Sequence, residues 1–256
     1  MENTIRIYES PHGLQPSTTS ILGLLDKYYL RQWAADCTAR FIRETCRKVQ
    51  DGIWEVKESD LALAVNNWKS ESQTAADFGT DLHSIAELYF RSFHSSEDAE
   101  RLEAALSISE PDTLALFLAL RDWAETEKIV PKEIEKVCHG DGYSCRVDLI
   151  AERDGKLGLY DIKTSKNGQY GDTWGLQLAA NAAAYEYHTG NKIEEIGIIK
   201  LTKKTLRLNF SETGRGPHYT EQRPRLEKAF SHLVKFFWEY EDFAEKRKHL
   251  KPTVQV

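Results

Sequence analysis

The stretch RVDLIAERDGKLGLYDIKTSK, residues 146–166, decides the expected fold. Two short runs rich in apolar and β-branched residues flank Asp154–Gly155, a dipeptide typical of tight β-hairpin turns. A loop of two or four residues centred on this dipeptide would pair Asp148 with Asp161 across the two strands. Their Cβ atoms would then stand about 5 Å apart. A three-residue loop would break this register.

Two facing carboxylates in an apolar sheet need a compensating partner, because they repel each other and lose hydration when buried. The apolar neighbours Val147, Leu149 and Ile162 argue against a solvent-exposed hairpin with incidental acids. Protonation of one carboxyl, or a buried arginine that pairs with both, would relieve the repulsion. A divalent cation such as Mg²⁺ is the more economical solution, since it prefers oxygen ligands. Lys163 follows Asp161 by two residues and so points to the same face, where it can stabilise negative charge or orient a water.

The three residues Asp148, Asp161 and Lys163 form a D-x₁₂-D-x-K pattern on this hairpin. The pattern resembles the core of the PD-(D/E)XK nuclease superfamily. The short motif is common by chance, so its context carries the resemblance. The segment PSTTSILGLLDKYYLRQWAA, residues 16–35, is similar to the opening of phage exonucleases and of the mitochondrial genome maintenance exonuclease in the RecB-type branch.

An upstream helix and an upstream strand extend the resemblance. FGTDLHSIAELYF resembles the G-x-x-x-H helix of the RecB-type branch, with Gly79, His83 and Glu87 on one helical face. The branch also has a glutamate on the strand before the first aspartate. Glu135 in IEKV matches that pattern best, whereas a four-residue HGDG loop would set Glu133 opposite the aspartate. We prefer Glu135.

A downstream helix matches the branch in part. GLQLAANAAAYE resembles the Q-x-x-x-Y helix that follows the DxK strand, with Gln177 in the first position. Asn181 stands where the tyrosine is usual, and Tyr185, one turn further on, can substitute for it. A structural role for Gln177 on an alanine-rich helix is the alternative.

The resemblance implies a Mg²⁺- or Mn²⁺-dependent deoxyribonuclease that hydrolyses phosphodiester bonds from DNA ends with one or two ions. Its partners would be single-stranded DNA or duplex ends and a recombination or single-strand-binding protein, in DNA recombination, repair or phage replication. A catalytically weak DNA-binding or partner-binding module is the alternative. A hydrolase of small phosphate compounds lacks support from any glycine-rich phosphate loop. The implied metal ligands are His83, Glu135, Asp148, Asp161 and the backbone carbonyl of Ile162; the implied catalytic residues are Asp148, Asp161, Lys163 and Glu135; and Gln177 and Tyr185 would bind substrate.

Composition limits the binding partners, the bound metals and the cellular location that we expect. The net charge of −6 argues against a generally basic coating for nucleic acid. The four cysteines show no C-x-x-C spacing, so we expect reduced thiols and no zinc site. Some relatives hold an iron–sulfur cluster with three cysteines downstream of the core, and this chain has none after Cys145, so we expect no cluster. No apolar run predicts a membrane span and no signal-peptide pattern is present, which favours the cytoplasm, or the host cytoplasm for a phage protein.

Several further residues have two possible roles each. The basic residues downstream of the hairpin either line a phosphate-binding groove or are solvated charges on the surface; they are Lys166, Lys200, Lys203, Lys204, Arg207 and Arg215. Tyr170 and Trp174 can stack a base or pack in the core.

The order of elements predicts a single domain, 1–256, with a mainly helical part over 1–128 and a nuclease core with a C-terminal helix over 129–256. We expect mostly helix over 16–127, then strands at 133–139, 143–152 and 156–164. A helix at 174–189, strands at 195–202 and 205–210, and a helix over about 221–248 would follow. This order predicts an α/β (α+β) fold with a restriction-endonuclease-like central mixed sheet flanked by helices.

Overall fold

A computed structural model describes residues 5–25, 28–165, 173–202, 215–240, 243–246 and 248. The chain divides into two compact units, one made of Met1–Leu24 with Leu82–Val256 and the other of Leu25–Asp81. The predicted boundary between the helical part and the core, at 128/129, falls inside the first unit, between the last helix before the sheet and its first strand. Among the described residues, no helix has a stretch both long and apolar enough to cross a membrane.

A four-stranded mixed sheet forms the centre of the first unit. Its order is β5 (Val130–His139), β6 (Ser144–Arg153), β7 (Lys156–Ser165) and β8 (Glu195–Thr202). The first three strands form an antiparallel meander, and β8 runs parallel to β7. A parallel neighbour requires a crossover, and α6 (Trp174–Thr189) provides it. The predicted α/β (α+β) class with a central mixed sheet flanked by helices is confirmed.

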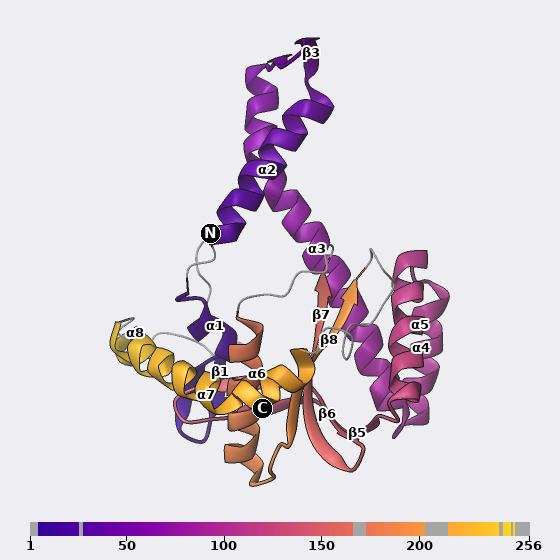
Figure 1. Ribbon diagram of the computed structural model, residues 1–256, viewed down its shortest axis with the longest axis vertical. Coiled ribbons are helices and arrows are strands. Elements are labelled where there is room, and N and C mark those ends of the chain that lie inside the picture. The colour runs from indigo at the N-terminus through magenta and orange to yellow at the C-terminus, as the bar shows by residue number, and fades with distance from the viewer. Residues whose placement is uncertain are drawn as a thin grey trace. The chain divides into compact units, whose positions relative to one another are not determined.

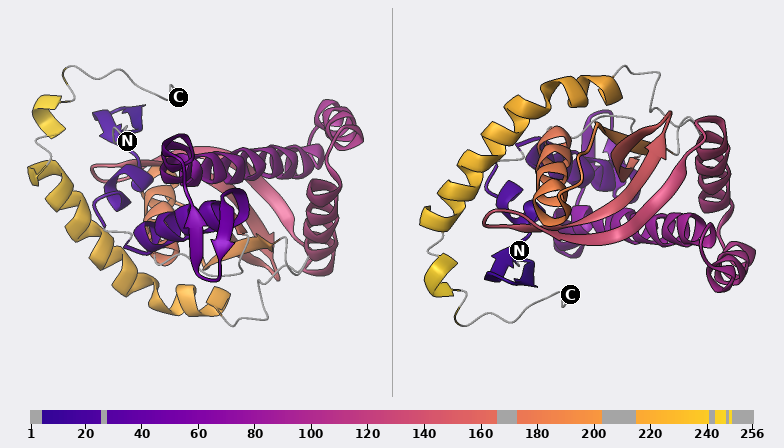
Figure 2. Two further views of the ribbon diagram at one scale, coloured as in Figure 1. Left: turned by 90° about the horizontal axis from the view of Figure 1, so that it is seen from above. Right: turned by 90° about the horizontal axis from the view of Figure 1, so that it is seen from below.

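Helices cover both faces of this sheet. Figures 1 and 2 show α6 beside α7 (Arg215–Tyr240) on one side, with α4 (Ser96–Ser107) and α5 (Pro111–Thr126) on the other. Two neighbouring residues of β7 contact helices on opposite faces of the sheet. The Tyr160 ring contacts Trp123 of α5, with ring centroids 6.4 Å apart, whereas the next residue, Asp161, receives a hydrogen bond from α6.

The Asp154–Gly155 turn has the two-residue form that its sequence predicts. Both residues adopt left-handed backbone, with φ of 51° and 75°, which is the conformation of a type I′ hairpin turn. The register then runs without a shift from Arg153↔Lys156 to Leu149↔Tyr160. The predicted two-residue turn is therefore confirmed, and so is the register as far as Leu149↔Tyr160, whereas the predicted pair Asp148↔Asp161 is not part of the ladder.

Smaller elements complete the first unit. The chain opens with a hairpin of β1 (Ile7–Ser10) and β2 (Gly13–Pro16), followed by α1 (Thr18–Leu22) and its Ser17 N-cap. The predicted C-terminal helix is present as α7, but it begins at Arg215 instead of about 221, and the short helix α8 (Phe243–Lys246) follows. The strand predicted at 205–210 lies outside the described residues.

The second unit is a helical hairpin. α2 (Tyr28–Thr45) and the first part of α3 (Glu58–Ser92) are its helices, and β3 (Arg47–Gln50) with β4 (Ile53–Glu55) forms a short antiparallel ribbon between them. The helices agree with the predicted mostly helical region, whereas the ribbon was not predicted.

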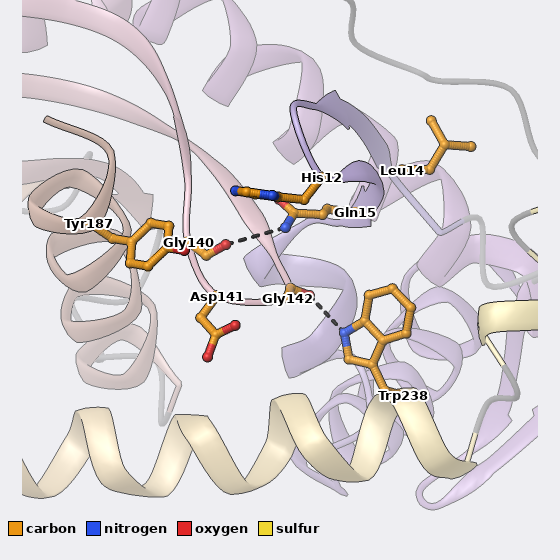
Figure 3. A pocket seen from close by; sticks show the side chains of 8 residues that line it. All are labelled: His12, Leu14, Gln15, Gly140, Asp141, Gly142, Tyr187 and Trp238. Carbon is orange, nitrogen blue, oxygen red and sulfur yellow. Dashed lines mark hydrogen bonds between the residues drawn. The ribbon is translucent and has the colours of Figure 1, made fainter.

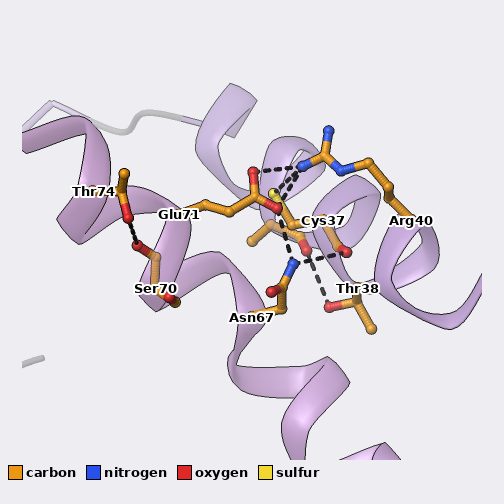
Figure 4. Close-up of polar contacts among 8 residues, drawn as sticks. Cys37, Thr38, Arg40, Asn67, Ser70, Glu71 and Thr74 are labelled. Atoms are coloured by element: carbon orange, nitrogen blue, oxygen red, sulfur yellow. Dashed lines mark hydrogen bonds and ion pairs between the residues drawn. The ribbon is translucent and has the colours of Figure 1, made fainter. Parts of the chain in front are cut away.

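Polar contacts join the two helices of the second unit. Figure 4 shows Glu71 of α3 facing Arg40 of α2, with 2.6 Å between Arg40 Nη2 and Glu71 Oε1. Asn67 donates to the same carboxylate at 2.9 Å and to the carbonyl of Cys37 at 3.4 Å. Seven large apolar side chains of this unit are exposed: Leu30, Val49, Ile53, Val56, Leu61, Leu63 and Val65.

Candidate active site

Asp148 and Asp161 lie where β6 and β7 cease to pair. The last hydrogen-bonded partners are Leu149 and Tyr160, one residue before the two aspartates would meet. On the other edge of β7, Asp161 pairs with Ile198 of β8, as the residues before it pair with β8. On the β6 side, the Asp148 carboxylate accepts the backbone N–H of Ile162 at 2.8 Å. A side chain thus replaces the ladder at this point, and both carboxylates remain at the junction of the two strands.

Asp161 is surrounded by donors. It is 3% exposed, and each of its oxygens has a different partner. Gln177 of α6 donates from Nε2 to Oδ1 at 2.9 Å, and Lys163 Nζ lies 2.6 Å from Oδ2. The predicted helix position of Gln177 and the predicted strand position of Lys163 therefore both converge on this carboxylate.

Burial and the neighbouring charges shift the pKa values of Asp148 and Lys163. Burial and then the neighbouring charge of Asp161 raise the pKa of Asp148 well above its usual range. Burial would lower the pKa of Lys163, but the charges of Asp161 and Asp148 outweigh burial and raise it. Lys163 is therefore an ammonium group near neutral pH, which makes it a donor and a positive charge and not a ready proton acceptor.

His83 reaches the same place from α3. Its Nδ1 lies 3.8 Å from Asp148 Oδ2. Burial lowers the pKa of His83, Asp161 opposes this effect, and Lys163 reinforces it. The imidazole is thus neutral near pH 7, the form in which a ring nitrogen can bind a metal ion. The backbone of Ile162 is adjacent, since it also acts on the pKa of His83.

Glu135 and not Glu133 lies opposite Asp148. The pairs Ile134↔Leu149 and Lys136↔Val147 flank the position, because the connecting loop is 140–143, one residue later than HGDG. Glu133 pairs with Ile150, so the alternative register is not adopted.

The backbone is unusual at Glu135 itself. Its φ is 53°, a left-handed value that costs free energy for any residue except glycine, and the pair with Asp148 is missing from the ladder. Its carboxylate contacts Arg146 Nε at 2.6 Å. Burial raises the pKa of Glu135, Arg146 opposes this effect, and Glu87 adds to it, so Glu87 is a near neighbour.

The structure does not bring Tyr185 to the carboxylates. The side chain is 2% exposed, and its hydroxyl donates to Glu133 at 2.7 Å. Eight helical residues turn through about 80° beyond two full turns, which separates Tyr185 from the face of Gln177. Asn181 is also buried, and within the described part of the chain its Oδ1 has no hydrogen-bond partner. Substrate binding by Tyr185 stays a prediction.

The other basic and aromatic candidates are distributed differently. Lys200 is fully buried, and its Nζ lies 5.6 Å from the centre of the Trp174 ring, so it is no solvated surface charge. Trp174 is partly buried in the first turn of α6. The remaining candidates lie outside the described residues or have side chains that do: Lys166, Tyr170, Lys203, Lys204, Arg207 and Arg215.

Sequence reasoning overlooked Arg146. An arginine two residues before Asp148, on the same face of β6, was the available signal.

The side chains at this junction are of the types that bind a hard divalent cation. Asp148, Asp161 and Glu135 offer carboxylate oxygens and His83 a neutral nitrogen, the ligand types that Mg²⁺ and Mn²⁺ accept. Over the described ranges, no group of three or more such side chains already has metal-binding geometry. The ammonium group of Lys163 instead provides the positive charge beside Asp161.

A separate pocket lies at the other end of β5 and β6. Its volume is about 290 Å³, and Figure 3 shows Tyr187 and Trp238 on either side of Asp141. Trp238 Nε1 donates to the Gly142 carbonyl at 2.8 Å. None of the predicted site residues lines this pocket.

Comparisons with known proteins do not identify a family. No protein-family model matches the chain, and no curated protein matches it. A solved structure of a protein designated SSO0001 is 18% identical, covering 57% of this chain and 74% of that chain with a TM-score of 0.25. That similarity supports no statement about fold or function.

Proposed function

We propose that the chain is a metal-dependent deoxyribonuclease that hydrolyses phosphodiester bonds from DNA ends. The observation that carries the proposal is the meeting of Asp148 and Asp161 at the β6–β7 junction with Lys163 on the same face. A buried carboxyl such as Asp148, whose pKa is raised by burial and by a neighbouring charge, is typical of reactive sites. The resemblance to PD-(D/E)XK nucleases assigns the same three residues independently of their geometry.

The proposed roles follow from the chemistry of each group. Asp148, Asp161, Glu135, His83 and the Ile162 carbonyl would hold one or two Mg²⁺ or Mn²⁺ ions. Such an ion lowers the pKa of a bound water and neutralises charge that develops on the phosphate.

Lys163 and Gln177 act around that centre. Because the pKa of Lys163 is raised, its ammonium would donate to the attacking water or to a phosphate oxygen instead of removing a proton. Gln177 would fix the rotamer of Asp161 through the 2.9 Å hydrogen bond to Oδ1. Single strands or duplex ends are the proposed substrates, and the cytoplasm, or that of a phage host, is the proposed location.

A cleavage experiment tests the proposal. Linear and circular DNA, each single- and double-stranded, are incubated with the protein in Mg²⁺, Mn²⁺ or EDTA. We expect loss of linear DNA only, and no loss in EDTA. Cleavage of circles would contradict the requirement for ends, and cleavage in EDTA would contradict the metal dependence.

The alternative is a DNA-binding module without turnover, and the buried Asn181 in place of the usual tyrosine favours it. Intact DNA with retarded mobility in every lane would support that alternative. Intact DNA with unchanged mobility would contradict both functions.

A further inference from the structure

Arg146 stands beside the acidic cluster with much of its side chain in solvent. It precedes Asp148 by two residues on β6, so the two side chains share one face of the strand. Its Nε lies 2.6 Å from Glu135 Oε2, and 48% of the side chain is exposed. The guanidinium is therefore anchored at one end and open at the other.

The open end has the shape that a phosphate requires. In the described part of the structure, the contact of Arg146 with a charged group is made by Nε, and no partner is found for either terminal nitrogen. Those two nitrogens carry parallel N–H groups, which match two oxygens of one phosphate. The Glu135 contact holds the plane of the guanidinium, so less rotamer entropy is lost when the phosphate binds.

The charge balance of the cluster calls for such a cation. Asp148, Asp161 and Glu135 repel a polyanion, and the charge of Lys163 is already committed to Asp161. Arg146 is close enough to lower the pKa values of both Glu135 and His83. It is thus a positive charge that both faces solvent and belongs electrostatically to the site.

We infer that Arg146 binds a backbone phosphate of the nucleic acid that enters the candidate active site, an inference that rests on the proposed nuclease function. The contact would be bidentate and independent of base sequence. It would position the strand over the carboxylates, so Arg146 is a substrate-binding residue and takes no part in proton transfer.

The test compares Arg146→Gln and Arg146→Lys with native protein and with Arg101→Gln. Arg101 is a matched control, since it is also exposed and also contacts one acid, Asp98 at 3.0 Å, but it lies on α4. Affinity for fluorescein-labelled single-stranded and duplex DNA is measured in EDTA by anisotropy over a series of salt concentrations. Cleavage in Mg²⁺ then gives kcat and KM, and thermal unfolding shows that each variant folds.

We expect Arg146→Gln to weaken DNA binding about tenfold or more, as the loss of a charge-assisted bidentate contact does. Its salt slope should fall by about 0.7–0.9, one phosphate contact fewer. Arg146→Lys should keep the slope but recover only part of the affinity, and Arg101→Gln should change neither.

A purely structural role would give a different result. If Arg146 only holds Glu135, both variants would lower kcat while affinity and salt slope in EDTA stay native, and the inference would be wrong. Native protein that neither binds nor cleaves DNA would instead refute the proposed function. The two failures are thus distinguishable.

Discussion

Asp148→Asn should stabilise the chain in EDTA and remove its stabilisation by divalent cations. Burial and the charge of Asp161 raise the pKa of Asp148, so ionising it in the folded state costs free energy. The amide keeps an oxygen for the Ile162 N–H and removes the charge. We expect a gain of about 0.5–2 kcal/mol in the free energy of unfolding, the range typical of a single stabilising substitution.

The pH dependence of this gain has a definite sign. The folded pKa of Asp148 is raised above the unfolded value of about 3.9. The contribution of Asp148 to the stability of the native chain is therefore fully present below about pH 3.9, and it is lost as the pH rises through the folded pKa. The advantage of Asp148→Asn should accordingly vanish below about pH 4.

Divalent cations should reverse the order of stability. At a free Mg²⁺ or Mn²⁺ concentration about 100 times Kd, binding to the folded state alone adds about 2.7 kcal/mol. That corresponds to a rise in Tm of about 5–11 °C for a chain of this size. Thermal unfolding in EDTA and across a metal titration measures both effects. An equal metal-induced shift in native and Asp148→Asn protein would refute the reasoning.

Three further variants probe single contacts. Glu135→Gly should be about 1 kcal/mol more stable than Glu135→Ala in urea unfolding, because φ is 53°; the usual order, with Ala above Gly, would contradict the strained backbone. Burial lowers the pKa of His83, so the unfolded chain binds more protons, and native stability should rise with pH up to about 6.5. His83→Gln should flatten that rise in the urea midpoint, and an unchanged slope would count against it. Gln177→Leu removes the donor to Asp161 Oδ1 and should cost about 1–3 kcal/mol in EDTA; a neutral result would show that this hydrogen bond contributes nothing.

Local chemistry made the hairpin predictable. Asp154–Gly155 specifies a two-residue turn through its backbone preference, and the turn sets the register up to Leu149↔Tyr160. The expectation that the two aspartates face each other followed from the turn alone, and the ladder ends one pair before them. Helical spacing likewise identified the element that carries Gln177.

Long-range contacts limited the rest. The β6–β7 ladder ends at Leu149↔Tyr160, and the parallel strand β8 pairs with β7 on its other edge; a hairpin sequence carries no sign of either feature. Tyr185 was chosen by distance along its helix, whereas its contact with Glu133 depends on how α6 packs on β5. The left-handed backbone at Glu135 could not be predicted from the sequence, because glycine is the residue that usually adopts this conformation and the position holds a glutamate.

The central claim is that Lys163 acts in turnover at a metal site formed by the two aspartates. Lys163→Met tests it most directly, with linear DNA cleavage and metal-induced thermal stabilisation measured on the same preparation. The account predicts that the variant is still stabilised by Mn²⁺ and no longer cleaves linear DNA. Cleavage by Lys163→Met at the native rate would contradict it.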